Sequence, residues 1–239
     1  MTKQMEDNGM IKRTSLLSCV LVVCVGMMCS INGDLRFVET ETLDQVDATL
    51  TISQAANASQ ATVEAVISDG PLTYVNLKDD QAVEVDGTAL SRSSLTGRYS
   101  ATVNAADQYT VTVREPTIGV HNTTITAPAD FIITSPLDDG TASLSGFTIT
   151  WSNADGNLQV EVALTQRILG ETRTLILDPV QDTGNMAVGA QALADARFGQ
   201  GADLTVTVTK VNELGAISGF RSGTLQARRA KLVVAQPGS

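Results

Sequence analysis

The sequence has little of the chemistry on which most enzymes depend. A single histidine, His121, occurs among 239 residues, although histidine-paired nucleophiles and multi-histidine zinc sites need that side chain. The three cysteines, Cys19, Cys24 and Cys29, all lie in one N-terminal apolar stretch, so no disulfide is expected within the rest of the chain. These absences predict a protein that is not an enzyme and that uses no cofactor.

Aromatic and basic residues are also scarce. Aromatic residues make up 4% of the chain, against 43% for hydrophobic residues as a whole, so the core has to be built mainly from Val, Ile and Leu, which favour β-sheets. Lys and Arg number 16 against 26 Asp and Glu, which gives a formal net charge of −10. Such a surface repels phosphate backbones, and the sequence therefore predicts no binding of nucleic acid.

The N-terminus has the layout of a secretory signal. Lys12 and Arg13 precede an uncharged, apolar run over residues 15–31, which gives way to a polar segment over residues 32–34. As a helix, residues 16–31 would span roughly 24 Å, which is short of the roughly 30 Å hydrocarbon core of a bilayer. The run therefore predicts export, and a permanent transmembrane helix is the weaker alternative.

The end of the apolar run resembles the lipobox of bacterial lipoproteins. Its residues are Gly26-Met27-Met28-Cys29-Ser30. The resemblance implies that Cys29 is diacylated and anchors the protein to a bacterial membrane, facing the periplasm or the cell surface. Residues 1–29 would then be the signal peptide and residues 30–43 a polar tether. The alternative is that Cys29 is one more apolar residue of a signal cut by ordinary signal peptidase.

Short segments of alternating apolar and polar residues begin near Val46. A period of two is typical of antiparallel strands with one face in water. The apolar positions of the first half are Ala48, Leu50, Ile52, Val63, Ala65, Ile67, Val83, Val85, Tyr99, Ala101, Val103, Tyr109, Val111 and Val113. Together with the segment 73–77 they predict about six strands before the turn at Glu115-Pro116, enough for a first β-sandwich domain over residues 44–123.

The pattern resumes after the Pro-containing connection 127–130. Phe147, Ile149 and Trp151 share one face of a predicted strand, and the turn over residues 153–157 predicts a hairpin into the next strand. Further predicted elements are strands at 158–164, at 172–177 before Asp178-Pro179, at 204–208 and within 224–234, and a helix within 186–198. These elements predict a second sandwich domain over residues 124–236.

Two stretches of the second half resemble a fibronectin type III or related immunoglobulin-like domain. The first runs from Phe131-Ile132-Ile133-Thr134-Ser135-Pro136 through Gly140 to Phe147-Thr148-Ile149-Thr150-Trp151-Ser152, and the second from Leu204-Thr205-Val206-Thr207-Val208 to Asn212-Glu213-Leu214-Gly215. The resemblance implies two opening strands with Trp151 in the core, and a penultimate strand with its hairpin.

The whole layout is similar to bacterial lipoproteins that carry such domains and have no assigned activity. The expected fold is all-β, with two tandem immunoglobulin-like β-sandwiches after an N-terminal signal. A resemblance at the level of the fold transfers no functional residue.

Acidic residues are the abundant reactive type, and four of them are candidates for a shared calcium ion. Asp138, Asp139, Asp130 and Glu115 lie near the expected domain junction, and calcium takes six to eight oxygen ligands. A solvated turn is the simpler interpretation, so no metal site is assigned. The segment 153–157 resembles the start of an EF-hand loop, but its sequence lacks the distal glutamate, which favours a hairpin turn.

One basic cluster lies near the end of the chain, and it consists of Arg221, Arg228, Arg229 and Lys231. On a terminal strand such charges protect a sheet edge from unwanted pairing. His121 has no candidate partner and is expected at the surface or in a linker.

These features favour a non-enzymatic envelope protein that serves as a structural or protein-interaction module. Loops or a free strand edge would contact an unknown protein or envelope partner. The alternative is a calcium-stabilised adhesive or matrix-binding protein, which a thermal melt with and without EDTA would distinguish. A third hypothesis is a carboxylate-dependent hydrolase, which needs two facing acids in a deep cleft.

Overall fold

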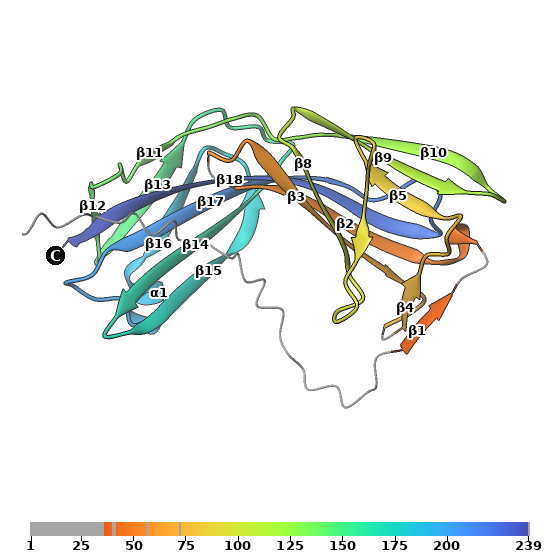
Figure 1. The fold of residues 1–239 in the computed structure, drawn as a ribbon. Coiled ribbons are helices and arrows are strands. Elements are labelled where there is room, and N and C mark those ends of the chain that lie inside the picture. Colours follow the sequence, from red (N-terminus) through yellow and green to blue (C-terminus); the bar gives the residue numbers. More distant parts are fainter. Residues whose placement is uncertain (1–35, 40–41, 56, 72, 239) are drawn as a thin grey trace, which may run out of the picture. The chain divides into compact units, whose positions relative to one another are not determined.

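The computed structural model describes residues 36–39, 42–55, 57–71 and 73–238 of the chain (Figure 1). Strands make up 61% of these described residues, and their α-helical content is one short helix, which confirms the predicted all-β fold. No helix within these described ranges is long and apolar enough to cross a membrane. The described residues belong to one compact unit.

The strands of the first half follow one another with short connections, and a 3₁₀ turn at Leu43–Gln45 precedes β2. They are β1 (Arg36–Glu39), β2 (Asp47–Gln54), β3 (Gln60–Ser68), β4 (Thr73–Asn76), β5 (Ala82–Val85), β6 (Thr88–Ala89), β7 (Ser91–Arg92), β8 (Tyr99–Asn104), β9 (Gln108–Glu115) and β10 (Gly119–Thr126).

The second half contains the one α-helix of the described residues. Its elements are β11 (Ile133–Ser135), β12 (Thr141–Ser143), β13 (Gly146–Trp151), β14 (Gln159–Ile168), β15 (Glu171–Gln181), β16 (Asn185–Gly189), α1 (Ala190–Asp195), β17 (Leu204–Leu214) and β18 (Ser222–Gly238).

The strands form three sheets in the described part of the chain. The largest has the order β1-β4-β3-β2-β18-β17-β14-β15, with β7, β8 and β12 joined at its sides. The second sheet has the order β10-β9-β5-β6, and the third has the order β11-β13-β16. Most neighbours are antiparallel, but β1 pairs with β4, and β18 with both β2 and β12, in parallel.

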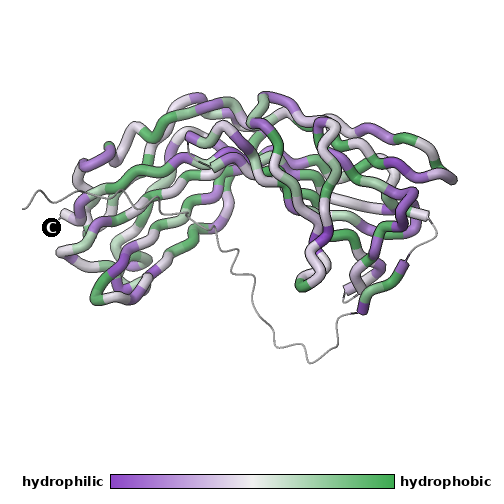
Figure 2. The backbone as a smooth tube through the Cα atoms, in the orientation of Figure 1, coloured by the Kyte–Doolittle hydropathy of each residue, from purple (hydrophilic) through white to green (hydrophobic). Residues whose placement is uncertain are grey.

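Buried aliphatic side chains gather in two hydrophobic clusters, here called the first and the second cluster. The first is built from the β2 and β3 part of the largest sheet and from the second sheet, as Leu50, Val63 and Val111 illustrate. The second is built from β14, β17 and the third sheet, and it includes Trp151, as predicted. Figure 2 shows hydrophobic and hydrophilic residues alternating along these strands, which is the pattern the sequence predicts.

Strand β18 belongs to both clusters. Leu225 and Ala227 lie in the first cluster, and Val233 and Ala235 lie in the second. Along its first half β18 pairs with β2 on one side and with β17 on the other. The predicted edge-protecting role of Arg228 and Arg229 is therefore wrong, because a strand lies on each side of them.

The predicted hairpin over residues 153–157 is also wrong. This segment joins β13 in the third sheet to β14 in the largest sheet, so the chain crosses from one layer of the second cluster to the other. Asn153, and not Gly156, has the positive φ of 55° at this crossing.

Two other elements differ from the predicted ones. Strand β15 continues through Pro179, because it is an edge strand, where a missing N–H is tolerated. Part of the predicted helix is strand β16, and only Ala190–Asp195 is helical. Strand β10 was not predicted, because its polar sequence contains Ile125 as its one buried residue.

Candidate functional site

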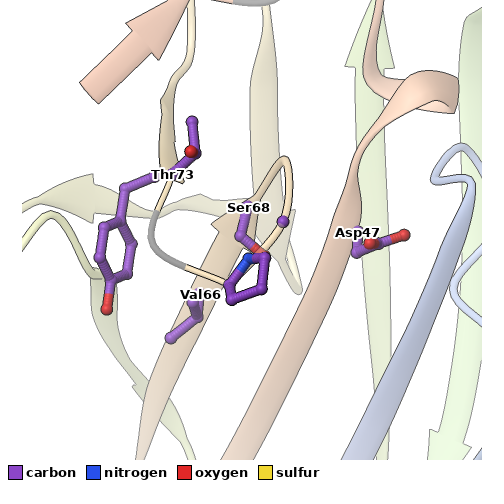
Figure 3. Close-up of a pocket in the computed structure, with 7 residues that line it drawn as sticks. Asp47, Val66, Ser68 and Thr73 are labelled. Carbon is purple, nitrogen blue, oxygen red and sulfur yellow. The ribbon is translucent and has the colours of Figure 1, made fainter. Parts of the chain in front are cut away.

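Tyr74 on strand β4 lines two hollows at the surface of the first half. The first hollow, of about 360 Å³, is lined by Asp47, Val66, Ser68, Gly70, Pro71, Thr73 and Tyr74 (Figure 3). Val66 and Ser68 share one side of β3 because side chains alternate along a strand. The lining combines hydroxyl groups, one carboxylate and one aromatic ring, which suits hydrogen bonding and stacking with a ligand.

A second hollow, which Tyr74 also lines, has a volume of about 530 Å³. It is lined by Glu64, Tyr74, Ser93, Leu95, Thr96, Arg98, Tyr99 and Ser100. Arg98 and Glu64 form an exposed ion pair at 3.8 Å. The turn between β7 and β8 therefore supplies an apolar tip and a charged group to the same hollow.

Phe37 on β1 packs against Tyr74 beside these hollows. The two ring centroids lie 6.0 Å apart, and the Arg92 guanidinium lies 4.7 Å from the centroid of the Phe37 ring. Such a cation–π contact stabilises an exposed aromatic ring.

Tyr99 is fixed below the second hollow by two backbone groups. Its hydroxyl donates to the carbonyl oxygen of Val75 at 3.1 Å and accepts from the N–H of Leu77 at 2.8 Å. Burial raises the pKa of Tyr99, so the phenol is neutral at physiological pH and acts as a structural group.

Asp47 is the carboxylate of the first hollow, and it is held by two neighbours. Arg221 donates from Nη2 and Nε at 2.7 and 3.0 Å, and the Ser222 hydroxyl donates at 2.7 Å. The Arg221 hydrogen bonds, followed by that of Ser222, lower the pKa of Asp47 from 3.8 to about 2. This carboxylate is therefore charged at any physiological pH.

A third hollow, of about 400 Å³, lies where the β2–β3 turn faces β18, and it is lined in part by Asp130, Arg229 and Lys231. The buried Arg229 donates from Nε to the Gln54 side chain at 2.8 Å. Lys231 pairs with Asp130 at 2.9 Å and lowers the pKa of that carboxyl. Two of the predicted basic residues are thus engaged with groups of the same chain.

A buried ion pair lies inside the second cluster. Lys210 Nζ is 2.8 Å from Asp182 Oδ2, and both side chains have 0% exposure. The ammonium also donates to the carbonyl oxygens of Ser152 and Asn153, and it lies 4.9 Å from the centroid of the Phe131 ring. All three ammonium hydrogens therefore have an acceptor.

The Asp182 carboxylate has a full set of donors as well. Oδ1 accepts from Trp151 Nε1 at 2.7 Å and from the N–H of Gly184 at 3.2 Å, and Oδ2 accepts from the N–H of Asp155 at 3.1 Å. Burial raises the pKa of Asp182, but the bonds from Lys210 and Trp151 outweigh burial, and the net shift is downward. The pair is therefore charged, complete and sealed from water.

The shifted acids share one property that bears on chemistry. Asp47, Asp130 and Asp182 all have a lowered pKa because a cationic side chain lies against each of them. A carboxyl group that donates a proton in catalysis needs a raised pKa. These groups are suited to holding structure together and to electrostatic recognition.

The four predicted calcium candidates are not gathered at one site. Asp138 accepts from the N–H of Val234 at 2.9 Å, and the N–H of Asp139 donates to the carbonyl oxygen of Val234 at 2.7 Å. Asp130 is paired with Lys231, as above. Glu115 is buried at the end of β9, where Oε1 accepts from the N–H of Thr117 at 2.9 Å. In the described ranges no group of three or more acidic, His or Cys residues is placed to hold a metal.

The other predicted positions have ordinary surroundings. His121 lies on β10, with Nε2 at 2.9 Å from the carbonyl oxygen of Ile118 and Nδ1 at 3.3 Å from the Ser218 hydroxyl. Arg228 pairs with Glu161. Cys29, the predicted lipidation site, lies outside the described residues.

The buried ion pair was not predicted from the sequence, although the pattern around one of its members, Lys210, indicates a buried lysine. Lys210 follows Leu204, Val206 and Val208 with a period of two, which places its side chain on the buried face of β17. A lysine in that phase needs a buried anion. Asp182 follows β15 in a turn, and no local pattern distinguishes it from a solvated aspartate.

Comparison of the chain with protein-family models finds no match, and comparison with curated proteins also finds none. The function has to be inferred from the chain's own residues.

Proposed function

We propose that this chain is an exported, lipid-anchored protein of the cell envelope that serves as a structural and protein-interaction module without catalytic activity. Cys29 would carry the lipid, and two immunoglobulin-like sandwiches, one around each cluster, would form the body. The antiparallel β11–β13 pair beside Trp151 and the long β17–β18 hairpin support this architecture, because they correspond to the strands on which the resemblance is based.

The sharing of β18 between the two clusters is the observation that carries the proposal. Two sandwiches joined by a flexible linker would reorient freely, whereas here one strand supplies buried side chains to both. Residues 225–235 of that strand also pair continuously with β17. A backbone that is hydrogen-bonded through the junction resists bending, which suits a protein that holds a binding surface at a fixed place.

The surface around Tyr74 supports the interaction role. Its two hollows adjoin one aromatic ring and are lined by polar, charged and apolar groups. Aromatic and arginine side chains are enriched where proteins bind one another. The strongly coupled charges, by contrast, are buried in the second cluster, where a substrate has no access.

Spin-label distance measurements test the rigid connection. Labels at Val120→Cys on β10 and Ile176→Cys on β15 would lie on opposite clusters, and each native side chain is 58% exposed. We expect one narrow distance distribution. A control pair at Val120→Cys and Thr88→Cys, within the second sheet, gives the width expected for a single rigid sheet. A distribution between the clusters that is several times broader than this control would contradict the proposal.

Mass spectrometry of the mature protein from native membranes tests the anchor. A new N-terminus at Cys29 with the added mass of acyl chains would support it. An unmodified N-terminus beyond residue 29 would show that the protein is exported without a lipid.

A further inference from the structure

Two large apolar side chains are exposed where β1 meets the β7–β8 turn. Phe37 on β1 is 40% exposed, and Leu95 in the turn between β7 and β8 is 89% exposed. These two residues are called the apolar tip. In Figure 1, β1 and the β7–β8 turn project toward the same side, and Figure 2 shows hydrophobic residues at both places.

Contacts between β1 and the β7–β8 turn hold the apolar tip together. A Cβ atom added to Gly97 would lie 2.5 Å from Cε1 of Phe37, so the ring sits directly on that glycine. Arg92 covers the Phe37 ring at 4.7 Å, and Leu95 and Tyr74 line the same hollow. Phe37 is therefore presented at a fixed position next to the tip of the turn.

The chain length before β1 restricts where the apolar tip can lie. Phe37 lies eight positions after Cys29, and a fully extended chain covers at most about 3.6 Å per position, or about 29 Å. If Cys29 carries a lipid, as in the proposed function on which this inference rests, the tip stays within that distance of the bilayer.

Basic side chains lie beside the apolar tip. Arg36 is on β1, Arg92 on β7 and Arg98 in the β7–β8 turn, and the Arg92 guanidinium lies against the Phe37 ring. Basic side chains beside exposed aromatic and aliphatic ones are suited to the headgroup region of an anionic bilayer.

We propose that the apolar tip is a second membrane contact, which inserts Phe37 and Leu95 into the headgroup region of the bilayer that holds the Cys29 anchor. The lipid alone leaves the protein free to rotate about its tether. Insertion of the tip would fix which side of the first cluster faces the membrane, and it would place the hollows beside Tyr74 close to the lipid surface.

Fluorescence of a polarity-sensitive label tests the contact. The protein is purified from membranes in its mature form and reconstituted into vesicles of phosphatidylethanolamine and phosphatidylglycerol, with NBD on Leu95→Cys. The matched control carries NBD on Leu169→Cys, at the β14–β15 turn, where the native leucine is 98% exposed. We expect a several-fold rise in emission at position 95, with quenching by lipid-bound nitroxides, and no change at position 169.

A second variant and the intact mass separate the possible outcomes. Phe37→Ser should reduce the rise at position 95 while the circular dichroism spectrum stays native. An acylated protein whose label at position 95 stays water-exposed would overturn the membrane contact and leave the anchor standing. A protein without the acyl mass would overturn the anchor and the contact together. If the NBD emission at position 95 rises with protein concentration and is not quenched by lipid-bound nitroxides, the apolar tip contacts a second copy of the chain and not the bilayer, which would overturn the membrane contact.

Discussion

Buried polar groups at the border of the first cluster are single and separate, whereas the second cluster encloses a charged pair. The hydroxyls of Tyr99 and Tyr109 bond to backbone groups, and Glu115 and Arg229 are buried apart from each other. Lys210 and Asp182 are fully enclosed in the second cluster. A hydroxyl group that loses its partner costs less than an enclosed ion that loses its counter-ion.

This difference determines where the fold tolerates the loss of a polar side chain. A neutral hydroxyl adds about 1 kcal/mol to a core that the aliphatic side chains already hold together. The charged pair, in contrast, is stabilising only while both members and their hydrogen-bond partners are present. The second cluster is therefore expected to be far more sensitive to the loss of one polar group.

The replacement Asp182→Ala should have the largest effect. It leaves the Lys210 ammonium buried with carbonyl partners only, so the free energy of unfolding should fall by about 3–5 kcal/mol. Urea unfolding followed by circular dichroism measures this loss without relying on Trp151, which contacts the mutated carboxylate. The double replacement Asp182→Ala with Lys210→Met should be more stable than Asp182→Ala alone. Equal stability of the two would show that the pair is not buried in solution.

Lowering the pH should destabilise the protein through the same Lys210–Asp182 pair. The folded pKa of Asp182 lies below its ordinary value of 3.8, so its contribution is complete at neutral pH and is lost as the pH falls below about 4 and through the folded pKa. The wild-type protein should therefore lose more stability between pH 5 and pH 2.5 than the Asp182→Ala/Lys210→Met double variant does. Urea midpoints at several pH values measure the difference. Parallel loss in both proteins would assign acid sensitivity to other carboxyl groups.

The strand faces could be predicted from the sequence, but the strand neighbours could not. Alternation identified the buried positions of β2, β3, β9 and β17, because the period of two is a local property. It could not show that β18 lies beside β2, with paired residues 175 positions apart in the chain, since pairing partners are set by the packing of whole layers. The crossing after β13 was mistaken for a hairpin for the same reason.

The candidate surface was harder to predict than the fold. Tyr74 is recognisable as a strand residue, but its first hollow forms only where β2 and β3 lie beside β4, and its second only where the β7–β8 turn comes against β4. Asp47 and Arg221 lie 174 residues apart in sequence, and no local pattern joins them. The four predicted acidic residues, in contrast, are near one another in the sequence, but the fold does not gather them at one site.

The replacement Tyr99→Phe tests the first cluster with a smaller expected effect. It removes the acceptor of the Leu77 N–H and the donor to the Val75 carbonyl, so the free energy of unfolding should fall by about 1–2 kcal/mol. Tyr109→Phe, which removes one acceptor from the Ala106 N–H, is the matched control and should cost less. Urea unfolding of both variants measures the order, and a loss at Tyr99 as large as that at Asp182 would remove the contrast between the clusters.

The smallest effect on stability is expected from Arg221→Gln at the first hollow. Arg221 is the main reason that the pKa of Asp47 is lowered to about 2, so its removal should raise that pKa toward 3.8, while the Ser222 hydroxyl keeps it somewhat lower. Because the pair is exposed, the melting temperature should hardly change. Carboxyl-carbon NMR titration measures the pKa, with Arg98→Gln as a control that leaves Asp47 unaffected. A pKa that stays near 2 would mean that Ser222 and the backbone, and not the arginine, set the charge of this hollow.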